Sequence, residues 1–327
     1  MSYLFQTPVI SIVGPTASGK SGVAIEIAKR LNGEIVSVDS LQVYRHFDIG
    51  TGKVTLEEQS LAPHHLIDIV APDKEYNAAD FQADADRVIA EIHARGHVPI
   101  LAGGTGLYLK ALLHGLFDTP SDQTLRESLR ARAEAEGLLT LYRELQDVDP
   151  KAAEKISSRD AVRIIRALEV FQLTGSPFSS LAAQHRHGER RYPVLTLGLM
   201  WPRPVLYERI VRRVEMMFQE GWSTEVEMLR GMGYGPELKP MQCIGYREIN
   251  AVLAGELDAD ILYQRVCKQT KAYAKRQLTW FRKEAVSWFP SPQALLEDAV
   301  LPREIESFLA APETYTPPEP LLQPKKE

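Results

Sequence analysis

The chain of 327 residues contains only two cysteines, Cys243 and Cys267, and it has no long apolar run. Two thiols cannot form a four-thiolate zinc site, and so few cysteines are typical of a protein in a reducing compartment. No apolar stretch approaches the ~20 residues that a membrane-spanning helix needs. The first six residues lack the basic and apolar regions of a signal peptide. We therefore expect a cytoplasmic protein without a membrane partner.

The chain also lacks an excess of positive charge, because 43 acidic residues outnumber 38 lysines and arginines. The net charge of −5 argues against nonspecific coating of nucleic acid by the whole protein. One segment departs from this average. Residues 268–283 contain six basic side chains and no acidic one, namely Lys268, Lys271, Lys275, Arg276, Arg282 and Lys283.

Such a local basic surface is typical of phosphate binding, and Tyr273, Trp280 and Phe281 in the same segment could stack on unpaired bases. The alternative is a helix whose aromatic side chains belong to the core and whose lysines face water. The residues of this segment alone favour that alternative.

The strongest motif, G-P-T-A-S-G-K-S, occupies residues 14–21. It follows the apolar run 8–13, which predicts a buried strand, and precedes residues 22–31, whose apolar positions recur at helical spacing. In this context the backbone N–H groups, the helix N-terminus and the Lys20 ammonium form a nest for a diphosphate or triphosphate, and the Ser21 hydroxyl could hold Mg²⁺. An ordinary glycine-rich turn is the alternative, which the flanking strand and helix disfavour. The nest consists of Gly14, Pro15, Thr16, Ala17, Ser18, Gly19, Lys20 and Ser21.

Two further predicted strands end on residues suited to a ligand. Residues 34–39 end on Asp39, and residues 97–102 are followed by Gly103, Gly104 and Thr105. Strand ends face the ligand crevice in open parallel sheets, so these residues are expected near the nest. Asp39 as a helix N-cap and the glycines as a simple turn are the alternatives. The third strand does not end in the aspartate of a usual NTPase, which disfavours an ATP-hydrolysing motor.

The remaining patterns predict the organisation of the chain. Residues 46–78 read as irregular, with His64 and His65 in a surface loop, since no third ligand is spaced with them for a metal. Residues 77–95 predict a helix, and residues 192–199 a further strand. A helical run over 204–229 is broken near Gly221.

Residues 119–190 show several helical patterns and little strand pattern, which predicts a helical insertion. Arg159, Arg163 and Arg166 lie on adjacent turns there, either as a solvated face or as a polyanion contact. The expected fold is therefore α/β: a P-loop NTPase-like parallel sheet flanked by helices, with an inserted all-helical domain. Residues 1–118 and 191–310 would form the core, and residues 311–327 a disordered tail.

Six stretches together resemble one family, the tRNA dimethylallyltransferases, which modify adenosine 37 beside the anticodon. They are G-P-T-A-S-G-K-S at 14–21, D-S-L-Q-V-Y at 39–44, G-G-T-G-L-Y at 103–108, residues 163–170, Q-C-I-G-Y-R-E at 242–248 and K-R-Q-L-T-W-F-R at 275–282. They occur in the family's order, and the first three together are highly specific. No zinc finger of the kind found in some eukaryotic relatives is present, so the chain resembles the short bacterial form. Cys243 stands where the family more often has alanine.

The resemblance implies that a dimethylallyl group passes from dimethylallyl diphosphate to N6 of adenosine 37 in tRNAs that read codons starting with U. Diphosphate is released, and the nest holds this diphosphate rather than ATP. Asp39 is implied as the acceptor of the N6 proton. Lys20, Thr105 and Arg213, with Mg²⁺, would stabilise the departing diphosphate. A monomer is expected.

The resemblance also implies contacts with the tRNA anticodon stem-loop, and with it the RNA-binding interpretation of residues 268–283 becomes the favoured one. The implied residues are Asp39, Ser40, Leu41, Gln42, Thr105, Arg126, Val162, Arg163, Ile164, Ile165, Arg166, Gln242, Cys243, Ile244, Gly245, Tyr246, Arg247, Lys275, Arg276, Gln277, Leu278, Thr279, Trp280, Phe281 and Arg282. Adenosine 37 would leave the loop's base stack to reach Asp39.

Two other functional classes are weighed against this one. A P-loop small-molecule or nucleotide kinase would consume ATP and would leave the G-G-T-G-L-Y stretch and the basic segment without a role. A nonenzymatic RNA-binding protein would not need Asp39.

Overall fold

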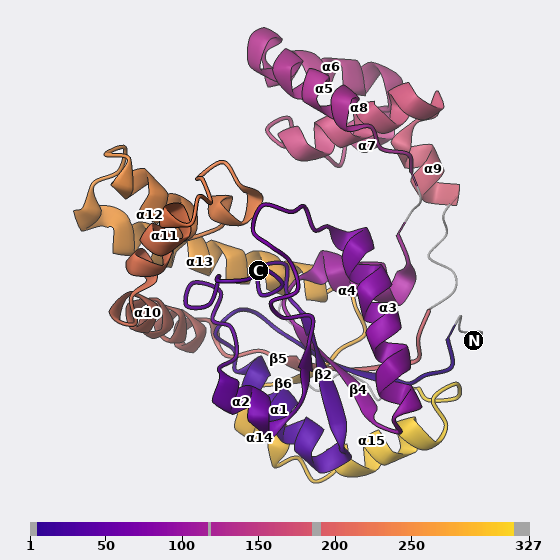
Figure 1. Cartoon of the computed structure of the whole chain (residues 1–327). Helices are drawn as coiled ribbons and strands as arrows, with labels where there is room; N and C mark the ends of the chain where they lie inside the picture. Colours follow the sequence, from indigo (N-terminus) through magenta and orange to yellow (C-terminus); the bar gives the residue numbers. More distant parts are fainter. Residues whose placement is uncertain (1–4, 117–118, 185–190, 317–327) are drawn as a thin grey trace. The chain divides into compact units, whose positions relative to one another are not determined.

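The computed structural model describes residues 5–116, 119–184 and 191–316 (Figure 1). The chain forms two compact units. Met1–Gly115 together with Glu189–Glu327 form the first unit, and Leu116–Gly188 form the second. None of the helices in the described part of the chain is long and apolar enough to cross a membrane.

A sheet of six parallel strands lies at the centre of the first unit, in the order β3-β2-β4-β1-β5-β6. The strands are β1 Val9–Val13, β2 Gly33–Val38, β3 His64–His65, β4 Val98–Gly103, β5 Val194–Leu199 and β6 Ser287–Phe289. Val13, the last residue of β1, pairs with Gly103 on one side and Gly198 on the other. The predicted parallel α/β core is confirmed, and the segment after Val13 leaves from the middle of the sheet.

Helices cover both faces of this sheet (Figure 1). Because strand side chains alternate between faces, Ile10 and Ile12 of β1 belong to one hydrophobic cluster and Val9 and Val13 to another. The helices are α1 Lys20–Leu31, α2 Leu56–Leu61, α3 Ala78–Ala94, α4 Gly106–His114, α10 Arg203–Gln219, α11 Trp222–Gly231, α12 Tyr246–Leu253, α13 Ala259–Phe281, α14 Pro292–Leu296 and α15 Leu301–Ala310, with a 3₁₀ helix, η1, at Lys239–Gln242.

The predicted break at Gly221 is confirmed, because this residue has a φ of 98° between α10 and α11.

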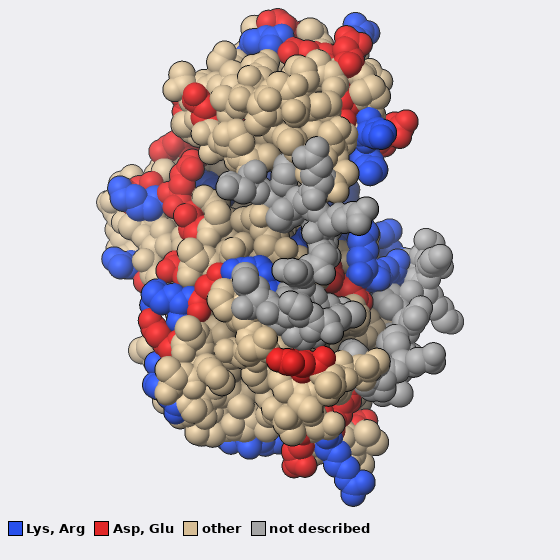
Figure 2. Space-filling view, turned by 90° about the vertical axis from the view of Figure 1, so that its right-hand side faces the viewer, with Lys and Arg blue, Asp and Glu red and all other residues tan. Residues whose placement is uncertain are grey.

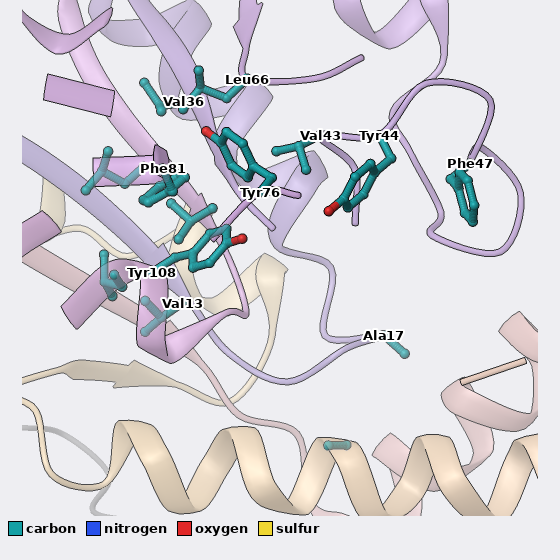
Figure 3. Packing of buried hydrophobic residues seen from close by; sticks show 14 of the residues in the cluster. Val13, Ala17, Val36, Val43, Tyr44, Phe47, Leu66, Tyr76, Phe81 and Tyr108 are labelled. Atoms are coloured by element: carbon teal, nitrogen blue, oxygen red, sulfur yellow. The ribbon is translucent and has the colours of Figure 1, made fainter. Parts of the chain in front are cut away.

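Aromatic side chains tie α3 to α4 beside the sheet (Figure 3). The ring of Phe81 stacks on Tyr108 with 4.6 Å between centroids, and Tyr76 meets Tyr108 edge-on at 6.3 Å. Val13 and Val36 of the sheet belong to the same cluster. This packing fixes the start of α4, directly after the end of β4.

The prediction that residues 46–78 are irregular, with His64 and His65 in a surface loop, is wrong. Thr55 and Glu58 form a capping box that begins α2, and His64–His65 form an edge strand paired with Ile35 and Val36. A two-residue strand is too short to show any periodicity, and α2 contains no buried residue that would have marked a hydrophobic face.

The second unit consists of five helices in its described part: α5 Gln123–Glu136, α6 Leu138–Val148, α7 Pro150–Ala153, α8 Ala161–Thr174 and α9 Phe178–Gln184. Asp122, Asp149 and Asp160 cap α5, α7 and α8 through their side chains. Leu141, Leu145 and similar side chains form its separate core. In the predicted disordered tail, the ring of Tyr315 lies 5.2 Å from that of Phe308, and residues 317–327 lie outside the described residues.

A buried carboxylate joins the edge of the sheet to α3. Glu34 on β2, whose side chain is 4% exposed, accepts hydrogen bonds from Arg95 at 2.9 and 2.7 Å. His65 on β3 and His97 next to β4 each lie 2.6 Å from the same carboxylate. The Arg95 bonds, with those of the two histidines, lower the pKa of Glu34 to about 2 although burial acts in the opposite direction.

Glu34→Gln should lower the free energy of unfolding at pH 7 by about 2–3 kcal/mol, less than for a fully enclosed ion pair because Arg95 is half exposed. The folded-state pKa of Glu34 lies below the unfolded value, so its contribution is present above pH ~4 and is lost as the pH falls toward 2. Urea unfolding should therefore show wild-type and variant stabilities converging between pH 7 and pH 3.

Glu26→Gln is the control, because Glu26 pairs with Lys29 on the surface. A stability difference that is equally large at pH 7 and pH 3 would contradict the role given to Glu34.

Candidate active site

Residues 14–19 form a loop that connects the centre of the sheet to the N-terminus of α1. Two glycines take up backbone conformations that other residues rarely adopt, with φ of 149° at Gly14 and 96° at Gly19. A Cβ on Gly14 would lie 2.6 Å from the carbonyl oxygen of Leu199. The strand–loop–helix context of the motif is confirmed, and the loop can wrap tightly because its glycines carry no side chain.

Lys20, the first residue of α1, is folded back onto this loop. The Lys20 ammonium donates to the carbonyl oxygen of Pro15 at 2.8 Å. Burial lowers the pKa of Lys20 to about 7, with a further contribution from Arg213 and an opposing one from Asp39. Burial also lowers the pKa of Arg213. Two half-buried cations therefore act on one half-buried carboxylate, an arrangement that favours an anionic ligand.

One cavity of about 360 Å³ brings together fifteen of the predicted site residues. Among the predicted residues its lining includes Thr16, Ala17, Lys20, Ser21, Asp39, Ser40, Leu41, Gln42, Arg213, Gln242, Cys243, Ile244, Arg247, Arg276 and Gln277. It also includes Tyr273, which the sequence offered as a stacking side chain, and residues that the sequence did not indicate, among them Gly50, Thr51, Gly52, Ile210, Val214, Met217, Trp222 and Thr270. Six stretches of the chain, within residues 16–21, 39–52, 102–104, 210–222, 242–247 and 270–277, thus meet around one volume.

Asp39 lies at the carboxyl end of β2 and lines this cavity. One of its oxygens accepts the N–H groups of Leu41 at 2.9 Å and Gln42 at 3.4 Å, so the side chain caps a turn rather than a helix. Burial raises the pKa of Asp39, whereas these hydrogen bonds and the two cations oppose the rise. A carboxyl group in such surroundings is suited to accept a proton.

Thr105 joins the ends of two strands. Its N–H group donates to Val38 at 3.2 Å, and its hydroxyl accepts the N–H of Ser40 at 3.2 Å. It lines a neighbouring hollow of about 290 Å³ that shares Ser40, Leu41 and Cys243 with the main cavity. Thr105 therefore stands beside the main cavity and fixes the turn that follows Asp39.

The apolar wall of the cavity comes chiefly from α10. Ile210, Val214 and Met217 follow one another at helical spacing on its buried face. Across from them, Glu225 accepts the N–H groups of Asp48, Ile49 and Gly50 at 2.9, 2.6 and 3.2 Å. This buried carboxylate holds the irregular loop of residues 48–52 against the cavity.

Some of the predicted tRNA contacts on and near helices α12 and α13 lie on the surface, and others lie in the interior. Lys275, Arg276, Thr279 and Arg282 are exposed, and Leu278 and Trp280 are half-buried. The side chains of Gln277, Phe281 and Tyr246 are buried, and the Tyr246 hydroxyl donates to Glu225 at 2.6 Å. The side chains of Phe281 and Tyr246 face the protein interior, so the prediction that these two contact tRNA is corrected: a contiguous motif on a helix includes both of its faces. Gln277 lines the main cavity, and its contact with tRNA stays a prediction.

A similar correction applies within the second unit. Ile164 and Ile165 belong to its core, whereas Val162 and Arg163 are exposed. Arg126 and Arg166 both bind the buried Glu169, at 3.1 and 2.8 Å.

On the face drawn in Figure 2, lysine and arginine side chains lie interspersed with acidic ones.

The comparisons with known proteins agree with one another. A family model described as IPP transferase matches residues 42–284. The tRNA dimethylallyltransferase of Geobacter sulfurreducens is 48% identical over 289 residues, which cover 88% of this chain and 93% of that relative. tRNA dimethylallyltransferase 1 of Trichlorobacter lovleyi is 49% identical over 287 residues, covering 87% of this chain and 94% of that relative.

Solved structures show the same likeness. The full-length tRNA isopentenylpyrophosphate transferase of Bacillus halodurans superposes with a TM-score of 0.67 at 41% identity, covering 94% of this chain and 97% of that one. A eukaryotic dimethylallyltransferase acting on tRNA superposes with a TM-score of 0.78 at 28% identity, covering 96% of this chain and 82% of that one.

On the expectation from the sequence that the nest holds dimethylallyl diphosphate, binding of this compound without tRNA should be accompanied by proton uptake at pH 8. Much of Lys20 is neutral there because its pKa is about 7, whereas the diphosphate is already ionised, since phosphate groups lose their second proton near pH ~6. A bound polyanion raises the pKa of Lys20 again, so the affinity should fall as the pH rises above 7. Calorimetry in two buffers with different ionisation enthalpies measures the uptake.

Binding without proton uptake, or an affinity that increases from pH 7 to pH 9, would contradict a contact between Lys20 and the diphosphate.

Proposed function

The chain belongs to the IPP transferase family, and from this premise we propose that it transfers the dimethylallyl group of dimethylallyl diphosphate to N6 of adenosine 37 in tRNA. Its relatives carry the name tRNA dimethylallyltransferase, so the enzyme is a prenyltransferase and a kinase is not favoured. One observation carries the assignment to this site: a single cavity joins the phosphate nest, the half-buried carboxylate of Asp39 and an apolar wall.

The proposed reaction uses these three parts in one displacement. The nest and the charges of Lys20 and Arg213 receive the diphosphate, and the bond between the allylic carbon and the diphosphate oxygen breaks. The adenine N6 forms the new bond to that carbon. The N6 proton passes to Asp39, and diphosphate leaves with the electron pair of the broken bond. Negative charge that develops on the leaving oxygen is stabilised by preorganised N–H groups and cations.

Mg²⁺ fits this site through Ser21, whose hydroxyl lines the cavity in the first turn of α1. Mg²⁺ is commonly held by one or two protein oxygens together with substrate phosphates. No group of three His, Cys, Asp or Glu side chains that could hold a metal occurs among the described residues, so the diphosphate would supply the remaining ligands. When bound, the ion would neutralise part of the diphosphate charge.

The apolar wall has a chemical use. An allylic carbon that is losing its leaving group is readily captured by water. Ile210, Val214 and Met217 offer the five-carbon group an apolar surface, and contact with this surface would shield the reacting carbon from water on that side.

The tRNA would approach from the side of α13. Arg276 and Arg247 line the cavity. Lys275, on α13, and Arg282, directly after the end of α13, are exposed. We assign these side chains to the phosphates of the anticodon stem-loop, with adenosine 37 leaving its stack to reach Asp39. The exposed Val162 and Arg163 are proposed as contacts from the helical unit. The proposed substrates are tRNAs that read codons starting with U, and the enzyme is proposed to act as a monomer in the cytoplasm.

The direct test is an incubation with Mg²⁺, unmodified tRNA and isotopically labelled dimethylallyl diphosphate, followed by mass analysis of the digested nucleosides. A parallel reaction replaces the allyl donor with ATP. We expect label on adenosine 37 in the first reaction and no ADP in the second. ADP formation without labelled adenosine would overturn the proposal in favour of a kinase.

Asp39→Asn should reduce kcat by a factor of about 10²–10⁴, because the amide preserves the hydrogen bonds to Leu41 and Gln42 but cannot take the N6 proton. The affinity for tRNA should stay within about twofold, because Asp39 supplies no positive charge to the RNA phosphates. Single-turnover transfer and filter binding measure the two quantities. Equal losses of turnover and tRNA affinity would show that Asp39 serves RNA binding rather than proton transfer.

Lys275→Ala should weaken tRNA binding and flatten its dependence on salt, because each phosphate contact adds to the release of counterions. The control is Lys74→Ala, which removes an exposed lysine that pairs with Asp73. Affinities measured between 50 and 200 mM salt give the slope. A slope for Lys275→Ala equal to that of the control would argue against a phosphate contact at this position.

A further inference from the structure

We propose that Gln277 is a positioning residue for the diphosphate nest, and that the chain has glycine at position 104 to leave space for it. This inference rests on the proposed function, because its effect is measured on the binding of the allyl donor. It also assigns Gln277 a role other than the tRNA contact that its place in the basic segment suggested.

The amide of Gln277 bridges two loops of the site from α13. Its oxygen accepts the N–H group of Thr16 at 2.8 Å, and its nitrogen donates to the carbonyl oxygen of Gly104 at 3.0 Å. The side chain is 6% exposed. Because one partner is a donor and the other an acceptor, only an amide in this orientation satisfies both.

The space at Gly104 is filled by that same amide. A Cβ on residue 104 would lie 2.1 Å from the nitrogen of Gln277 and 3.2 Å from its amide carbon, and the next nearest atom, the oxygen of Gly14, would lie at an ordinary 3.5 Å. The φ of Gly104 is outside the left-handed region, so the backbone would accept alanine. The side chain of Gln277 is therefore what demands glycine here.

Other side chains hold the opposite side of the nest. Arg209 donates to the carbonyl oxygen of Ala17 at 2.8 Å, and the Trp201 indole donates to that of Ser18 at 3.1 Å. The guanidinium of Arg209 lies 4.9 Å from the Trp201 ring centre. The carbonyl groups of Ala17 and Ser18 and the N–H group of Thr16 are therefore all held by side chains from outside the loop. These bonds keep the loop in a shape in which its remaining N–H groups can bind a diphosphate.

Without Gln277 this shape would lose its support on the side that faces the end of β4. The N–H of Thr16 and the carbonyl of Gly104 would be left without their partner in a buried position, which the loop would relieve by turning toward water. The diphosphate would then bind a less preorganised nest. Binding of tRNA to the exposed face of α13 would be little affected.

The experiment compares Gln277→Ala, Gly104→Ala and the double variant. Steady-state transfer gives KM for dimethylallyl diphosphate, competition gives the inhibition constant of inorganic pyrophosphate, and filter binding gives Kd for tRNA. We expect Gln277→Ala to raise the first two constants about tenfold, the effect of about one lost buried hydrogen bond, and to change Kd for tRNA by less than about twofold. Gly104→Ala should be at least as impaired, because its methyl group displaces the amide.

The double variant is the decisive one. Once Gln277 is alanine, the methyl group on residue 104 meets no obstacle, so the double variant should match Gln277→Ala alone instead of combining both losses. Gln264→Ala, at an exposed glutamine of the same helix, is the matched control and should match the wild type. Additive losses in the double variant, or unchanged pyrophosphate inhibition in Gln277→Ala, would overturn the proposal.

A second substitution keeps the test valid if Gln277→Ala does not fold. Gln277→Glu can still accept the N–H of Thr16 but cannot donate to Gly104 as a carboxylate, and it adds negative charge next to the nest. Its KM for the allyl donor should exceed the wild-type value by more than about tenfold, and a wild-type KM would contradict the role of Gln277. A wild-type enzyme that transfers no label would instead refute the proposed function, which is a separate outcome.

Discussion

The charges of Lys20, Arg213 and Asp39 line one cavity, and the rest of the structure depends on keeping them there. Each group alone would be costly to bury, as the lowered pKa values of the two cations and the raised pKa of Asp39 show. Two cations and one anion leave a surplus of positive charge. In the proposed reaction a diphosphate would supply the missing negative charge, and Asp39 would remain as the group that can take a proton.

The parallel sheet brings these groups together at one edge. Strands β1, β2 and β4 are neighbours, so the loop after Val13, the residue after Val38 and the glycines after β4 emerge side by side. Helices from the later part of the chain complete the site: α10 contributes the apolar wall and α13 the clamp on Thr16. The donor end of the site therefore lies on rigid elements, which suits a reaction that depends on placing one carbon between a nitrogen and a leaving oxygen.

The sequence predicts those parts of the site that lie directly beside a strand or helix whose pattern is recognisable. The phosphate nest lies between a strand and a helix, and Asp39 follows a strand end, so the general geometry of parallel sheets locates both. Glu225 and Gln277 could not be located in this way, because each acts on a loop far away in the chain. Ile164 and Ile165 were misassigned because a contiguous stretch on a helix includes buried and exposed positions, and residues 46–78 were misread because their elements are too short to show a period.

The most direct test of this account is a crystal structure of the chain with Mg²⁺ and a dimethylallyl donor whose bridging oxygen is replaced by sulfur, so that it reacts slowly. The account predicts the diphosphate in the loop of residues 14–21, in contact with Lys20 and Arg213, and the allylic carbon directed into the cavity toward Asp39. A diphosphate bound elsewhere, or an allyl group pointing away from Asp39, would contradict it.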